Sequence, residues 1–228
     1  MFFLSNNLIK TINKRILLLF FLVVGRSLYG SGFELGLESL KAGDFAEAFC
    51  LWRPLAMQGH VEAAFHLGWL YANGNGLRVD INKAIYWWKR SAGKGHKDAM
   101  FALALAYTNG EGIKKDKHEA LKWYRNAATH GHGDAREIIK LKLLNPDKDL
   151  LVQLKEIVRE PWLGERRAVT ADKVNLRAGP GLSHPVVKRV VAGDSLIALD
   201  RQGKWRRVID PEDMSHAWVA EWLTELND

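Results

Sequence analysis

The sequence repeats itself with a period of 36 residues, and this restricts the fold more than any other feature. Gly59-His60 returns as Gly95-His96 and again as Gly131-His132. Other positions keep the same spacing: Ala63, Ala99 and Ala135; Leu67, Leu103 and Ile139; Tyr71 and Tyr107; Trp87 and Trp123. A fixed period of this length is typical of a solenoid, in which each unit covers the apolar face of its neighbour.

Each period is predicted to form two helices. Ala63, Leu67 and Tyr71 are spaced by four, which places them on one face of a helix. Gly74-Asn75-Gly76 then interrupts that helix, and Asp80 stands where the next helix needs an N-cap. The second helix carries a stripe of small and aromatic residues that lets helices approach closely: Ala84, Trp87, Trp88 and Ala92.

These motifs resemble the Sel-1-like repeat, a relative of the tetratricopeptide repeat, over about residues 35–143. The family signature runs A-x-x-x-L-G-x-x-Y-x-x-G-x-G and then D-x-x-K-A-x-x-W-Y-x-x-A-A-x-x-G, and it is matched from Ala63 to Gly95. The second copy has Ala104 where the family has glycine. The resemblance implies an α-solenoid, here over residues 31–145, that binds other proteins and carries no catalytic machinery.

The helical pattern ends at Asn145-Pro146-Asp147, because proline breaks a helix. Residues 148–159 form one further amphipathic pattern, so we assign residues 146–167 to a helix that caps the solenoid and a linker. From Val169 onward, short β-type runs alternate with turn signals such as Gly193-Asp194 and Gln202-Gly203. This spacing predicts a small β-barrel over residues 168–228.

The barrel residues resemble the bacterial Src-homology-3-like domain over about residues 168–226. The segment from Val174 to Pro180 reads V-N-L-R-A-G-P, and Gly203-Lys204-Trp205 and Trp218-Val219 follow in the family's order. Ala217 stands where the family has glycine. The resemblance implies an extracytoplasmic targeting or binding module. The predicted fold class is therefore multidomain: an α-solenoid of helix-hairpin repeats followed by a small SH3-like β-barrel.

Residues 1–30 have the order of a secretory signal peptide. Lys10, Lys14 and Arg15 precede the apolar run of residues 16–24, and small residues follow around Gly30. That run is short for a membrane span, which takes about 20 residues. We expect residues 1–30 to direct the chain to the periplasm or beyond, and an uncleaved membrane anchor is the alternative left open.

The formal net charge of +7 is concentrated at the N-terminus. Residues 1–30 hold four basic residues and no acidic one, so the remaining chain has a net charge of +3. Because no later segment forms a polybasic face, we expect no nucleic-acid partner.

The recurring histidines His60, His96 and His132 raise the question of a metal site. Equivalent positions on packed helices lie about 8–10 Å apart, whereas a zinc ion lies about 2 Å from each ligand. One ion therefore cannot bind all three, and we interpret them as structural residues near helix starts. His130-Gly131-His132 is at most a weak surface site.

No other residues suggest chemistry. Cys50, the single cysteine, lies in a helical apolar pattern and is expected to be a small buried side chain. Asp210, Glu212 and Asp213 are interpreted as a solvated loop rather than an acid pair. We predict no catalytic residue, no metal and no cofactor.

Two surfaces are candidates for binding. The first helix of each repeat lines the inner face of a solenoid, and after removal of the packing positions seven candidates remain: Glu62, His66, Trp69, Asn73, Asp98, Leu105 and Asn109. Trp69 is the best anchor, with packing against the neighbouring repeat as the alternative. On the barrel, Lys204 and Arg206 flank Trp205 and are candidates for an anionic ligand, the alternative being an ordinary hairpin.

The sequence therefore favours a non-catalytic, monomeric scaffold in the envelope or outside the cell. Its expected partners are one or more envelope proteins, with peptidoglycan as a further candidate and membrane contact only if residues 1–30 are retained. Two related readings stay open: a regulatory or targeting subunit of a peptidoglycan-processing enzyme, and a secreted factor acting on a host protein. A purely structural spacer is a third.

Export predicts a shortened chain. Because residues 1–30 have the basic, apolar and small-residue order that a signal peptidase recognises, protein purified from the envelope should lack them. Intact-mass spectrometry measures this directly. A mass that includes residues 1–30 would establish an anchored form instead.

Overall fold

The computed structural model describes residues 32–226, so the segment expected to direct export lies outside the described residues. These residues divide into two compact units. One unit ends at Ala99 and includes Glu111–Ile113, and the other contains Met100–Gly110 and the chain from Lys114 onward. None of the helices among the described residues is long and apolar enough to span a membrane.

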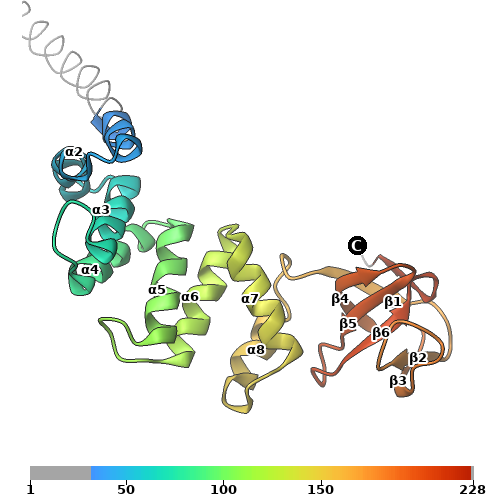
Figure 1. The fold of residues 1–228 in the computed structure, drawn as a ribbon. Coiled ribbons are helices and arrows are strands. Elements are labelled where there is room, and N and C mark those ends of the chain that lie inside the picture. The colour runs from blue at the N-terminus through green and yellow to red at the C-terminus, as the bar shows by residue number, and fades with distance from the viewer. Residues whose placement is uncertain (1–31, 227–228) are drawn as a thin grey trace, which may run out of the picture. The chain divides into compact units, whose positions relative to one another are not determined.

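The first unit consists of helices that pack in succession (Figure 1). A helix over residues 32–42 is followed by three more: α2 (Phe45–Met57), α3 (Val61–Asn73) and α4 (Ile81–Ala92). The predicted interruption lies after α3, where Gly74 takes the left-handed conformation that glycine adopts without strain. Asp80 caps α4 by accepting a hydrogen bond from the Lys83 N–H at 3.0 Å, as the sequence predicts.

The second unit begins with the next repeat. Its helices are α5 (Lys97–Asn109), α6 (Lys117–Thr129), α7 (Gly133–Leu144), the short 3-10 helix η1 (Lys148–Leu150) and α8 (Leu151–Ile157). Asp116 caps α6 as Asp80 caps α4. The expected helix over residues 148–159 is thus a 3-10 turn and a two-turn α-helix, and it packs against α6. Arg125 of α6 binds Glu160 at 2.8 Å and ties down the chain that follows α8.

The two helices of a repeat meet where a small residue faces a large aromatic one. Gly68 of α3 is buried, and a Cβ at this position would lie 2.5 Å from Nε1 of Trp88 on α4. Such a contact is far inside van der Waals range, so only glycine leaves room for the indole. The same unit repeats this arrangement between Gly36 and Trp52, whose ring lies in the space a Cβ would take.

The packing of the second repeat explains why alanine can replace glycine at the position equivalent to Gly68. Ala104 stands 36 residues after Gly68, and Tyr124 stands 36 residues after Trp88. Both are buried, and the Tyr124 hydroxyl lies 3.3 Å from Oγ1 of Thr108. A tyrosine ring is smaller than an indole, so it accommodates the methyl group of alanine. The larger residue on one helix is therefore matched to the smaller residue on the other in both repeats.

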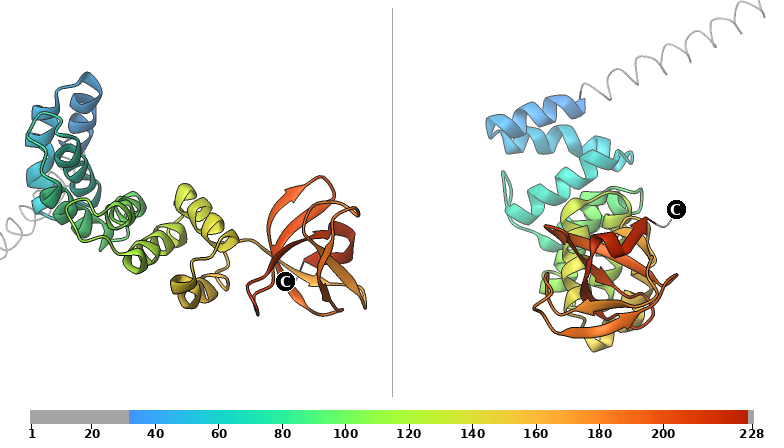
Figure 2. Two further views of the ribbon diagram at one scale, coloured as in Figure 1. Left: turned by 60° about the horizontal axis from the view of Figure 1, so that its bottom comes forward. Right: turned by 90° about the vertical axis from the view of Figure 1, so that its right-hand side faces the viewer.

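The C-terminal part is a seven-stranded antiparallel sheet, and its strands curl around one another (Figure 2). The strand order is β3-β2-β6-β5-β4-β1-β7. The strands are β1 (Glu165–Val169), β2 (Val174–Arg177), β3 (Val186–Val190), β4 (Ser195–Gln202), β5 (Trp205–Ile209), β6 (His216–Ala220) and β7 (Thr224–Leu226), with the 3-10 helix η2 (Glu221–Leu223) before β7. Because β1 pairs with both β4 and β7, the sheet joins the start of the domain to its end.

The core of this barrel consists of alternate strand residues, as expected for a sheet with one covered face. Its buried members include Val174, Leu176, Leu196, Val208 and Val219. β1 begins at Glu165, so the expected boundary at residue 168 falls inside the first strand. The expected fold class, a helical solenoid followed by a small β-barrel, is confirmed.

Cys50 is exposed, so the expectation of a buried cysteine is wrong. The apolar pattern around it led to that error. On α2, Ala48, Trp52, Leu55 and Ala56 face the core, and position 50 lies on the opposite side of the helix.

The pairing of a small with a large side chain between the two helices of a repeat predicts how substitutions change stability. Gly68→Ala should lower the free energy of unfolding by about 1–3 kcal/mol because the methyl group overlaps the Trp88 ring. Adding Trp88→Tyr, which copies the Ala104–Tyr124 pair, should restore part of that loss. Urea unfolding followed by circular dichroism measures both.

Ala104→Gly is the matched control for the exchange of Gly68. It should cost about 0.5–1 kcal/mol from helix propensity and about 0.8 kcal/mol more for the buried methyl group that it removes. A Gly68→Ala variant that is more stable than the natural chain would contradict the packing described here.

Candidate functional site

The expected binding positions on α3 are mostly engaged in packing. His66 stacks on Trp52 with ring centroids 4.7 Å apart, and burial lowers the pKa of its imidazole below the usual value. The Glu62 carboxylate lies 2.5 Å from Nε2 of His96. Both residues therefore make contacts within the first unit, while the Glu62 side chain stays 52% exposed.

Trp69 shows the same trend. Its side chain is half-buried and packs against the core cluster of α2, α3 and α4, which includes its own repeat and the helix before it. Asn73 is exposed and its Nδ2 donates to the Trp69 carbonyl at 2.8 Å. In this repeat the indole is therefore a packing residue, and its role as an anchor stays a prediction.

The next repeats place apolar side chains in solvent at the position of Trp69. Leu105 of α5 is 38% exposed, and Leu141 of α7, one period later, is 62% exposed. Asn109 and Asn145 keep step with Asn73, while Asp98 and Asn109 both have interaction partners. The sequence analysis missed Leu141 and Asn145, although extending the same period by one more step would have found them.

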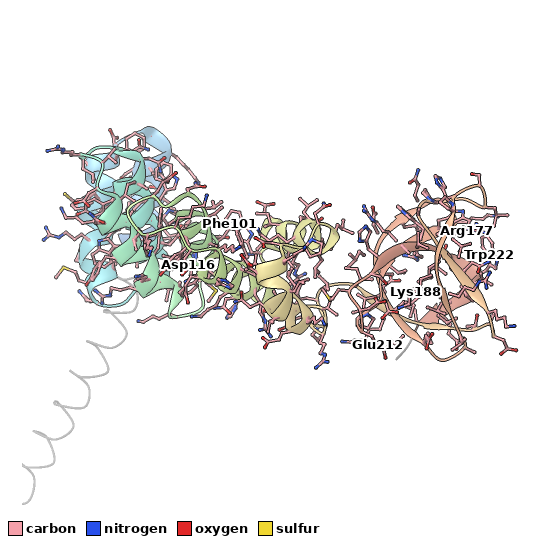
Figure 3. All side chains as sticks on the ribbon, turned by 90° about the horizontal axis from the view of Figure 1, so that it is seen from below. Phe101, Asp116, Arg177, Lys188, Glu212 and Trp222 are labelled. Atoms are coloured by element: carbon pink, nitrogen blue, oxygen red, sulfur yellow. The ribbon has the colours of Figure 1, made fainter. Side chains whose placement is uncertain are left out.

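The recurring histidines are helix caps. Nδ1 of His60 accepts a hydrogen bond from the Ala63 N–H at 3.2 Å, and His96 and His132 do the same at the starts of α5 and α7. Each imidazole also stacks on a phenylalanine: the ring of Phe101, labelled in Figure 3, lies 4.1 Å from that of His132. The structural interpretation of these residues is thereby confirmed and given a mechanism. No group of metal-ligating side chains forms among the described residues.

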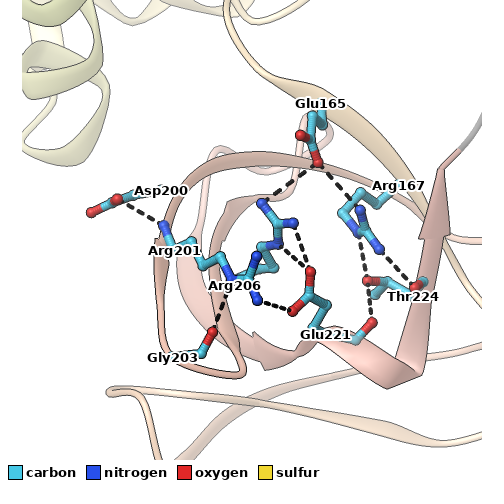
Figure 4. Close-up of polar contacts among 8 residues, drawn as sticks. All are labelled: Glu165, Arg167, Asp200, Arg201, Gly203, Arg206, Glu221 and Thr224. Atoms are coloured by element: carbon cyan, nitrogen blue, oxygen red, sulfur yellow. Dashed lines mark hydrogen bonds and ion pairs between the residues drawn. The ribbon is translucent and has the colours of Figure 1, made fainter.

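On the barrel, the two expected ligand contacts have different environments. The Arg206 guanidinium lies in a polar network around η2 (Figure 4), where Nη2 binds Glu221 at 2.7 Å and Nη1 lies 3.6 Å from Glu165. The hydrogen bonds from Arg206 lower the pKa of Glu221. Arg206 is therefore engaged within the fold, and its role as a ligand contact stays a prediction. Lys204, in the turn between β4 and β5, is exposed.

The same network fixes η2 from its other end. Arg167 is buried and donates from Nε to Oγ1 of Thr224 at 2.8 Å and from Nη2 to the Thr224 carbonyl at 2.9 Å. Arg201 adds a contact of 3.2 Å to Glu221. Sequence reasoning missed this network because its members come from β1, β4, β5 and the chain end.

The acidic loop between β5 and β6 is also structural. Asp210 is buried, and its carboxylate lies 2.5 Å from Nζ of Lys188, which also binds Asp213 at 2.7 Å. Burial raises the pKa of Asp213, but the hydrogen bonds from Lys188 and Ser215 outweigh it and hold that pKa at about 2. The interpretation of a solvated loop is wrong for Asp210, because Lys188 on β3 lies opposite it.

Comparison with known families assigns both modules. The Sel1 repeat model matches residues 61–96 and 97–132. The bacterial SH3 domain model matches residues 172–225.

The curated relatives share one short stretch with this chain. A protein described as a probable cell wall amidase LytH of Staphylococcus epidermidis is 38% identical over 56 residues, which is 25% of this chain and 19% of that protein. Its namesake from Staphylococcus aureus is 34% identical over a stretch of the same length. The chain thus spans about a fifth of the length of these relatives.

One solved structure supports the repeat fold, and a second shares sequence with this chain. The protective antigen c5321 of uropathogenic Escherichia coli, described as displaying an SLR fold, superposes with a TM-score of 0.51 at 22% identity, over 58% of this chain and 30% of its own. A Sel1 repeat protein from Oxalobacter formigenes is 31% identical over 52% of this chain and 96% of its own, with a TM-score of 0.46.

The environments of Arg206 and Lys204 predict different effects on the barrel's unfolding temperature when each charge is removed. Arg206→Met should lower the barrel's unfolding temperature by several degrees, because it leaves Glu221 without its closest cation in a half-buried network. Lys204→Met should leave that temperature unchanged, since the side chain is exposed. Thermal unfolding followed by tryptophan fluorescence measures both, and equal stability of the two variants would remove the structural role of Arg206.

Proposed function

Since the chain is a Sel1 repeat protein with a C-terminal bacterial SH3 domain, we propose that it is a non-catalytic scaffold of the cell envelope or the secreted fraction. The helical repeats bind a partner protein, and the barrel binds a cell-wall component. Export of the chain into that compartment depends on residues 1–30 and belongs to the same proposal.

One observation carries the role of the repeats: the exposure of leucine at the same position in successive repeats. A single exposed leucine is ordinary on a protein surface. Leu105 and Leu141 are one period apart, on α5 and α7. A repeat architecture presents equivalent positions side by side, and such an array makes an extended binding surface. Asn145, four residues after Leu141, is exposed and suited to hydrogen bonding with a peptide backbone.

The barrel's role rests on similarity. The relatives that share a stretch with this chain are described as probable cell wall amidases, and the chain carries a bacterial SH3 domain. A fold by itself does not determine a function, so the assignment to the cell wall depends on this likeness and on the exposed barrel surface.

The absence of catalysis is part of the proposal. The clusters of ionisable groups described above are engaged in other tasks: the histidines cap helices, and the arginines and aspartates of the barrel pair with one another. A catalytic base or nucleophile needs a group whose hydrogen bonds are available to the substrate, and these groups are already bonded within the fold.

A second candidate is favoured by the amidase likeness. The chain could serve as a regulatory or targeting subunit of a peptidoglycan-processing enzyme, with the enzyme as the partner of the repeats. This reading differs from the general scaffold only in the identity of that partner.

Cross-linking in the envelope tests the repeat surface. Leu141→Asp in the full chain should reduce capture of the principal partner on the order of tenfold, because a charge replaces an apolar contact. Val152→Asp is the matched control, since Val152 is also exposed but lies on α8. Capture should be unchanged by the control. Equal capture by both variants would contradict the assignment of the partner surface.

A further inference from the structure

The barrel carries an exposed tryptophan that no structural role explains. Trp222 lies in η2 at the periphery of the barrel (Figure 3) and is 61% exposed. Its ring meets that of Trp205 edge to face, with centroids 6.3 Å apart. The two indoles form a corner whose Trp222 side faces solvent. We call Trp205 and Trp222 the tryptophan corner.

The corner is held rigidly by the network described above. The Glu221 N–H donates to the Lys204 carbonyl at 2.9 Å, which joins η2 to the β4–β5 turn. Arg206 and Arg201 fix the Glu221 carboxylate directly before Trp222, and Arg167 fixes Thr224 two residues after it, so η2 is restrained from both ends (Figure 4). A surface ordered before binding loses less entropy when a ligand arrives.

The surroundings of the corner are polar and charged. Arg201 and Lys204, which contact Glu221 beside Trp222, are exposed, and among the described residues Lys204 forms no ion pair. Recognition of a proline-rich peptide uses a groove lined by several aromatic residues. A flat indole with a polar rim instead suits a sugar ring, whose C–H face is apolar and whose hydroxyl groups point outward to hydrogen-bonding groups.

We infer that the tryptophan corner binds a pyranose ring of an acidic glycan strand, with the ring stacked on Trp222 and a carboxylate of the strand paired with Lys204. This inference rests on the proposed function, because it names the cell-wall component that the barrel takes. The carboxylate is assigned to Lys204 because that ammonium is exposed and unpaired within the described part of the chain.

Binding of the full chain to three soluble probes tests the inference. The probes are peptidoglycan glycan strands freed of stem peptides, which carry lactyl carboxylates; N-acetylglucosamine oligomers, which carry none; and the isolated stem peptides. We expect the acidic strands to bind best, and the neutral oligomers about two- to fivefold more weakly, as for the loss of one exposed ion pair. Stem peptides should not compete.

Variants locate the site. Trp222→Ala should weaken binding of both glycans on the order of tenfold, and Trp222→Phe should retain part of it. Lys204→Met should reduce the affinity for the acidic strands to that for the neutral oligomers. It should leave the affinity for the neutral oligomers unchanged. Val187→Ala is the control, because Val187 is 55% exposed on β3, at the far edge of the sheet order. Thermal unfolding confirms that each variant is folded.

Sedimentation of the full chain with intact peptidoglycan sacculi separates this inference from the proposed function. If the chain sediments but Trp222→Ala has no effect, or if stem peptides compete in a Trp222-dependent manner, the glycan inference is overturned while cell-wall binding stands. If the chain does not sediment with sacculi at all, the proposed role of the barrel fails and the inference fails with it.

Discussion

The close approach of the two helices of each repeat is the interaction on which the helical part depends. A hairpin of two helices cannot bury its own apolar faces, and each must present a continuous surface to the next. Gly68 and Trp88, and then Ala104 and Tyr124, set the distance between the helices of a repeat by matching small to large. The histidine caps add a second link, since each ring both starts a helix and stacks on a phenylalanine of the repeat before it or of the N-terminal helix.

Most of the helical fold could be predicted from the sequence because the 36-residue period identifies structurally equivalent positions. The glycine breaks, the Asp80 and Asp116 caps and the buried stripes follow from local backbone and helix geometry. The order of short strands and turns likewise predicted the barrel. The contacts that the sequence could not show are those between residues distant in the chain: Arg206 pairs with Glu221, Asp210 with Lys188, and His66 stacks on Trp52. No local pattern reveals such pairs. Cys50 was misjudged for another reason, because apolar neighbours along the chain are not neighbours on a helix face.

The candidate binding surfaces consist of exposed side chains that neither packing nor ion pairing uses. Most charged and aromatic residues that look available in the sequence are used to hold the fold together. Four side chains remain exposed beside these packed and paired residues: Leu105 and Leu141 on the repeats, and Lys204 and Trp222 on the barrel. The networks have a functional consequence as well: the Arg206–Glu221 pair does not contact a ligand in our account, but it fixes the backbone that presents Trp222.

The central claim is that one chain joins a protein to the cell wall, and recruitment measures this most directly. Isolated sacculi are mixed with the partner identified by cross-linking, with and without the full chain, and the sedimented partner is quantified. The account predicts that the partner sediments only when the chain is present, and that recruitment falls again when the chain is in large excess, since separate copies then occupy each target. Sedimentation of the partner that does not depend on the chain would contradict it.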